Sequence, residues 1–124
     1  MLRAVLFIGV MICAAACGGS PEIGFTYSDL PEGDAGNGEK LFLQSINDAP
    51  TCASCHRLDS QNDIGPGLAR YAKVAGERVD NLSAEEYTFE SILRPSRYLA
   101  GNFSNLIYPD YLEALEPAEI ADLI

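Results

Sequence analysis

The sequence predicts an all-α domain in which a few short helices are joined by long loops, with no sheet. Ser83 and Glu86 have the spacing of a capping box, so a helix is predicted to begin there. This helix is predicted to end before Pro95, because the residue before a proline avoids the α region. A second helix is predicted over 117–124, where Pro117 suits a first turn and the apolar residues then recur at helical spacing.

The length and net charge of the chain limit the functions that it can have. The 124 residues suffice for one small domain and a leader, and a domain of this size often depends on a bound group for stability. The net charge is −10, with 18 acidic against 8 basic residues, and no basic stripe is present to meet phosphates. This balance argues against nucleic-acid binding. It is typical of a solvated acidic surface, and it also suits electrostatic steering toward a basic docking partner.

Residues 1–16 are predicted to be a secretory signal peptide. Arg3 gives an early positive charge, and an apolar or small run follows over 4–16. The run is too short to cross a hydrocarbon layer of about 30 Å, which requires about 20 helical residues. We therefore expect an exported protein, in the periplasm or at the outer face of the cell membrane.

Cys17 follows this leader directly. The stretch over 14–20 resembles a bacterial lipobox, in which cleavage leaves a lipidated cysteine at the new N-terminus, so Cys17 is predicted to anchor the protein to the membrane. The alternative is an ordinary signal peptide cleaved after a run of small residues. Residues 17–33 are rich in Gly, Pro, Ser and acids and are interpreted as a tether to a domain over 34–124.

The chemistry is concentrated in Cys52-Ala-Ser-Cys55-His56. C-x-x-C-H is the attachment pattern for c-type haem: two thiols add across the vinyl groups of the porphyrin, and the adjacent imidazole binds the iron. Two other interpretations remain open. A structural zinc site needs four ligands, and only these two cysteines and one histidine follow the leader. A dithiol or disulfide redox module without haem would leave His56 unexplained, and no strand-like alternation surrounds the motif.

Two further segments resemble the class I cytochromes c, and the resemblance extends over 34–124. Residues 34–42 are similar to the opening helix of that family, and Ile64-Gly65-Pro66-Gly67-Leu68 is similar to its G-P-x-L turn after the haem motif. The resemblance implies a small helical domain wrapped around one covalent haem c. It also implies one-electron transfer between a protein donor and a protein acceptor, rather than enzymatic catalysis.

The resemblance assigns roles to individual residues. Gly38 and Phe42 of the opening helix are expected to lie against the C-terminal helix, and the Pro66 carbonyl is expected to accept a hydrogen bond from His56. A ligating histidine is usually oriented through its second ring nitrogen, which supports this expectation. Side chains able to satisfy buried haem carboxylates are Tyr71, Arg94, Arg97 and Tyr98. Surface solvation or core packing is the alternative for each of these four.

The domain lacks the methionine that usually serves as the sixth iron ligand of the family. Both methionines, Met1 and Met11, lie in the leader. Ile107 or Tyr108 occupies the corresponding place, so Tyr108 is a candidate ligand, with a packed loop aromatic as the alternative. Lys73, water or an open site are further alternatives, and an open site predicts a haem-based sensor or haem enzyme that binds small ligands. The last helix stops mid-pattern, from which we expect a longer chain.

Overall fold

The computed structural model describes residues 22–124, and every regular element among them is helical. The prediction of an all-α fold is confirmed. The predicted signal peptide and Cys17 lie outside the described residues. In order, the elements are the 3₁₀ turn η1 (Tyr27–Asp29), α1 (Ala35–Leu43), the 3₁₀ turn η2 (Cys52–Ser54), α2 (Tyr71–Gly76), α3 (Ala84–Leu93), α4 (Tyr111–Ala114) and α5 (Pro117–Leu123). Within 22–124, no helix is long and apolar enough to cross a membrane.

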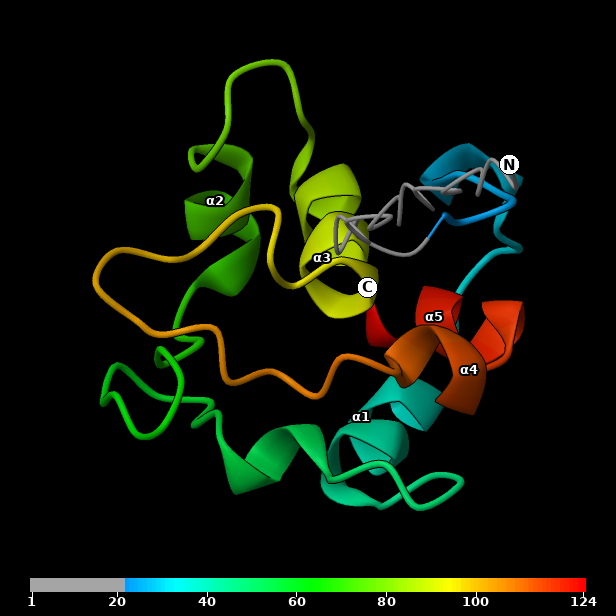
Figure 1. Cartoon of the computed structure of the whole chain (residues 1–124), viewed down its shortest axis with the longest axis horizontal. Helices are drawn as coiled ribbons and strands as arrows, with labels where there is room; N and C mark the ends of the chain where they lie inside the picture. The colour runs from blue at the N-terminus through cyan, green and yellow to red at the C-terminus, as the bar shows by residue number, and fades with distance from the viewer. Residues whose placement is uncertain (1–21) are drawn as a thin grey trace, which may run out of the picture.

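The first and last helices pack directly on each other. Gly38 of α1 lies against the backbone carbonyl of Asp122 in α5, so a side chain at position 38 would collide with backbone. The Asp122 carboxylate accepts hydrogen bonds from Asp34 N and Asn37 Nδ2, both at 2.6 Å. The expected contact of Gly38 with the C-terminal helix is therefore confirmed. In Figure 1, α1, α4 and α5 lie on one side of the molecule and α2 and α3 on the other.

Helix α3 forms the centre of the core. Glu86 N donates to Ser83 Oγ at 3.1 Å and Ser83 N donates to the Glu86 carboxylate at 2.8 Å, which confirms the predicted capping box. The helix ends at Leu93, two residues before Pro95. Phe89 and Leu93 are buried with two residues from the end of the chain, Leu115 and Ile120. One face of α3 thus holds the core together and leaves its other side chains free to line a cavity.

The stretch around η1 also packs on α3. The ring of Phe25 meets that of Phe89 edge to face, with centroids 5.7 Å apart, and three further apolar residues contact the same cluster: Ile23, Tyr27 and Leu30. These residues belong to the segment interpreted as a tether. Its part from Ile23 onward is attached to the core, because its aromatic and aliphatic side chains gain free energy by burial there.

Candidate functional site

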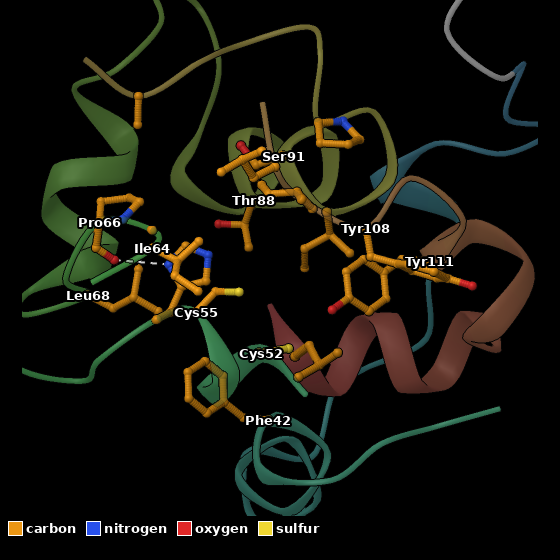
Figure 2. A pocket seen from close by; sticks show the side chains of 18 of the residues that line it. Phe42, Cys52, Cys55, Ile64, Pro66, Leu68, Thr88, Ser91, Tyr108 and Tyr111 are labelled. Carbon is orange, nitrogen blue, oxygen red and sulfur yellow. Dashed lines mark hydrogen bonds between the residues drawn. The ribbon is translucent and has the colours of Figure 1, made fainter. Parts of the chain in front are cut away.

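A cavity of about 680 Å³ opens between the helices and is lined mainly by apolar side chains. Its volume is within the range of cofactor pockets. Figure 2 shows Pro66 and Leu68 on one side and Tyr108 and Tyr111 on the other. In the same view, Thr88 and Ser91 of α3 lie above the cavity, and Cys52 of η2 and Cys55, its C-cap, lie below it. All parts of the predicted motif therefore meet at one place.

Turn η2 places the two cysteines. Thr51 caps it by accepting a hydrogen bond from Ser54 N at 3.0 Å, and Ser54 Oγ donates back to the Thr51 carbonyl at 2.6 Å. Cys52 and Cys55 are free thiols, both half-buried at the wall of the cavity. Burial raises the pKa of the Cys52 thiol. The turn therefore presents two neighbouring sulfurs to whatever fills the cavity.

The His56 ring is fixed from two sides. Its Nδ1 lies 2.9 Å from the Pro66 carbonyl oxygen, and because a carbonyl only accepts, Nδ1 must carry the proton. Gly65 packs flat on the imidazole: a Cβ there would lie 2.5 Å from Cε1 and 3.0 Å from Nε2. Gly65 N also donates to the Cys55 carbonyl at 2.9 Å. With Nδ1 bound to Pro66 (dashed line in Figure 2), Nε2 is left to bind a metal on the cavity side.

The opposite wall carries a pair of tyrosines. The rings of Tyr108 and Tyr111 pack edge to face with centroids 5.2 Å apart. The Tyr111 hydroxyl donates to the Pro50 carbonyl at 2.8 Å. Burial, reinforced by the nearby cysteine thiols, raises the pKa of Tyr111 to about 12. Tyr111 is therefore a neutral hydrogen-bond donor that holds the wall to the loop before Cys52, and Tyr108 lines the same wall.

Helix α3 provides the polar part of the lining. Thr88 Oγ1 donates to the Ala84 carbonyl at 2.6 Å and lies 3.3 Å from the Tyr71 hydroxyl, and burial raises the pKa of Tyr71. Ser91 Oγ is the one buried side-chain N or O atom in residues 22–124 without a hydrogen-bond partner. Ser91 follows Tyr87 by four residues and Thr88 by three, spacings that place side chains on one helix face, and this signal was not used to predict Ser91.

The four side chains proposed for haem carboxylates divide into two groups. Tyr71 and Tyr98 line the cavity. Arg94 and Arg97 are not among its lining residues and both pair with the Glu90 carboxylate, Arg97 at 3.1 Å.

The two arginines therefore differ from the expectation. Arg94 and Glu90 are four residues apart on α3, a spacing that favours an ion pair along the helix surface. The basic side chain that does line the cavity is Arg78, in the loop after α2. No motif surrounds Arg78 in the sequence. Lys73 lies outside the lining residues as well.

The residues present fit a haem attached by two thioethers. The sulfurs, a backbone-oriented imidazole and a large apolar wall meet at one cavity, and the glycine at position 65 allows the imidazole to lie directly against the backbone. Within 22–124, no three His, Cys, Asp or Glu side chains are grouped so as to hold a metal ion by themselves. The donor set thus suits a metal that is carried by a macrocycle, with one imidazole as protein ligand.

Comparison with known proteins agrees with this geometry. The sequence model of the family described as Cytochrome c matches residues 35–124, most of the chain. Cytochrome c of Ginkgo biloba is 26% identical over 113 residues, which cover 80% of this chain and 90% of the relative. The chain therefore belongs to the cytochrome c family, whose members carry covalently attached haem c and transfer electrons.

Proposed function

We propose that the chain is an exported, lipid-anchored monohaem cytochrome c that relays single electrons between two proteins. The observation that carries the proposal is the arrangement at the cavity wall, which the Cys52 and Cys55 thiols share with an imidazole whose Nδ1 is bound to the Pro66 carbonyl. When bound, the haem supplies a one-electron Fe(III)/Fe(II) couple. No residue is required to act on a substrate.

In this proposal, each residue of the motif has one task. Cys52 and Cys55 form the two thioether bonds, and His56 Nε2 binds the iron. Pro66 and Gly65 hold the imidazole in one orientation by hydrogen bonding and packing. A ring held in one orientation would keep the same ligation in both oxidation states, which favours fast electron transfer.

The haem carboxylates would be satisfied by polar groups of the cavity lining. Tyr71 and Tyr98 line the cavity with hydroxyl-bearing side chains, and Arg78 adds a positive charge. Arg94 and Arg97 have their charges directed to Glu90 instead. We therefore assign the contacts to the first three residues.

The rim of the cavity suits transient docking. Several large apolar side chains belong to the cavity lining, and those that the haem leaves uncovered would be open to a partner: Leu58, Ile64, Leu99 and Leu106. Exposed apolar groups are typical of protein interaction sites. With a net charge of −10, the chain would attract a basic partner to this rim.

Export and anchoring rest on the sequence of the leader and on Cys17. The docking of residues from Ile23 onward adds support, since it would hold the domain on a short connection to the lipid. Cys17→Ser is expected to release the exported protein from membranes in a fractionation experiment. Retention of that variant on membranes would contradict the anchor and leave the electron carrier intact.

The haem ligation is tested by His56→Ala, expressed with the haem-attachment machinery. The variant is expected to lose the normal ferrous c-type absorption, because no other histidine is present in the chain. Lys40→Ala, at an exposed position of α1, is the control and should keep the spectrum. An unchanged ferrous spectrum in His56→Ala would contradict the proposal.

A second function, binding of a small ligand at the haem, is favoured by one specific observation. The region 34–124 contains no methionine, so the usual sixth ligand of the family is missing. Carbon monoxide added to the reduced protein separates the two functions: fast, tight binding read by absorption favours the ligand binder, and absence of binding favours the electron carrier.

A further inference from the structure

Charge is distributed unevenly between the two sides of the molecule. The side of α1, α4 and α5, which comprises residues 35–54 and 108–124, has seven acidic side chains against one basic one. Residues 55–107, which include α2 and α3, have seven acidic side chains against six basic ones. Figure 1 shows the two groups of helices on opposite sides of the molecule. Of these two sides, only that of α1, α4 and α5 has a large excess of negative charge.

The acidic side chains on this side are not neutralised by neighbouring cations. Within residues 22–124, every ion pair joins two residues of 55–107: Arg57 with Asp59, and Glu90 with Arg94 and Arg97. On the side of α1, α4 and α5, five acidic residues are exposed: Glu39, Asp48, Asp110, Glu113 and Glu116. Their charges face solvent uncompensated, so their field reaches an approaching molecule over about 8 Å at physiological salt.

The turn that contains Asp48 is bound to α4. Asn47 Nδ2 donates to the Ala114 carbonyl at 2.8 Å, and the Tyr111 hydroxyl donates to the Pro50 carbonyl at 2.8 Å. Hydrogen bonds thus hold the chain to α4 on both sides of Asp48. The exposed carboxylates of this turn and of α4 therefore form one region, called the α4 surface below: Asp48, Asp110 and Glu113.

The α4 surface adjoins the site of haem attachment. Tyr111, the first residue of α4, lines the cavity together with Cys52 and Cys55. The two thiols are close enough to contribute to the raised pKa of Tyr111. Leu43, at the end of α1, is 59% exposed and does not line the cavity, so a haem bound there leaves it uncovered. Acidic groups, an exposed leucine and a short path to the haem are the features that a docking surface for electron transfer requires.

We propose that a redox protein with a basic surface docks on the α4 surface and exchanges electrons with the haem at the Cys52 side of the cavity. This inference rests on the proposed haem attachment and electron transfer, and it adds which side of the cavity the partner approaches. Complementary charge guides the encounter and fixes its orientation. The side of 55–107 exerts little attraction on such a partner, because its acidic and basic side chains nearly balance.

The probe is a lysine-rich peptide that carries a ruthenium tris-bipyridine complex. Light excites the ruthenium(II), which gives one electron to the ferric haem and becomes ruthenium(III). The second-order rate constant of this transfer is measured by transient absorption with the haem-loaded protein at low ionic strength. A triple variant of the α4 surface, Asp48→Asn, Asp110→Asn and Glu113→Gln, is expected to lower the rate constant about tenfold.

The matched control removes three exposed charges from the other side, through Glu77→Gln, Asp80→Asn and Glu85→Gln. It changes the net charge equally and should lower the rate constant less than about twofold. The difference between the two triple variants should vanish at high salt, where surface charges are screened. Equal slowing of the two variants in proteins with a normal c-type spectrum overturns the inference alone. Protein that matures without haem overturns the inference together with the proposed function.

Discussion

The two walls of the cavity are held in different ways. The wall of 55–68 is fixed largely by backbone groups: Gly65 N donates to Cys55 O, Leu68 N donates to Arg57 O at 2.8 Å, and the Pro66 carbonyl binds His56. The wall of 103–111 depends on side chains, with Tyr108 packed on Tyr111 and Tyr111 bound to Pro50. The comparison teaches that the orientation of His56 depends on backbone contacts made by a few small residues of the 55–68 wall. The 103–111 wall, in contrast, can present a different chemical group to the cavity when one side chain is exchanged.

Disrupting the 55–68 wall should have the largest effect on stability. Gly65→Ala places a Cβ 2.5–3.0 Å from three atoms of the His56 ring, so the ring must shift from the Pro66 carbonyl. We expect the free energy of unfolding to fall by about 1–3 kcal/mol, measured by urea denaturation. Gly24→Ala is the control, because nothing lies within 4 Å of its added Cβ. Wild-type stability of Gly65→Ala would show that the ring is not confined.

A smaller loss is expected on the opposite wall, and only from one tyrosine. Tyr111→Phe removes the donor to the Pro50 carbonyl and should lower the free energy of unfolding by about 1 kcal/mol. Tyr108→Phe keeps the ring contact with Tyr111 and should change the free energy of unfolding by less than about 0.5 kcal/mol. Equal losses in thermal or urea unfolding of the two variants would contradict the distinction between them.

Alkaline pH should weaken the same wall. The pKa of Tyr111 rises from 10.0 to about 12 in the folded chain, chiefly through burial. Because the pKa is higher in the folded chain, the stabilisation by Tyr111 is complete below its pKa in the unfolded chain. This stabilisation is lost as the pH rises toward and through its pKa in the folded chain. The free energy of unfolding is therefore expected to fall between pH 10 and about 12, and to fall less steeply in Tyr111→Phe. Parallel pH profiles of the two proteins would rule out this titration.

The smallest effect is expected outside both walls, at the contact between α1 and α5. Hydrogen bonds from the Asn37 amide, and next from Asp34 N, lower the pKa of the Asp122 carboxyl below 3.8. The ionised Asp122 carboxylate stabilises the fold fully above its pKa in the unfolded chain. This stabilisation is lost as the pH falls through its lower pKa in the folded chain. Asp122→Asn should therefore show a shallower acid loss of stability than wild type. Asp80→Asn, in an exposed loop, is the control. If Asp122→Asn lost stability in acid as wild type does, the hydrogen bonds of Asp122 to Asp34 and Asn37 would not contribute to stability.

Prediction from sequence succeeded where the signal is local. The capping box at Ser83 and the proline at position 117 mark helix starts through neighbouring residues alone, and both helices are present. Helices α2 and α4 have no such signals: α4 has four residues, and α2 begins after Arg70 in the left-handed region at φ 54°. Their formation depends on tertiary packing.

The same distinction applies to the site. C-x-x-C-H and the proline loop are compact motifs that carry the resemblance to class I cytochromes c, and that resemblance implied the contact of Pro66 with His56 that the structure shows. Which arginine reaches the cavity depends on how the loop after α2 crosses it, and no local pattern encodes that path. Arg94 was open to a better prediction, since Glu90 lies one helical turn before it.

The central claim is that two thioether bonds and one imidazole hold a haem in this cavity. It is tested most directly by purifying the exported, matured protein and measuring ferrous absorption together with thiol reactivity in denaturant. The account predicts a c-type spectrum, with Cys52 and Cys55 both resistant to alkylation. A colourless protein in which both thiols are alkylated would contradict it.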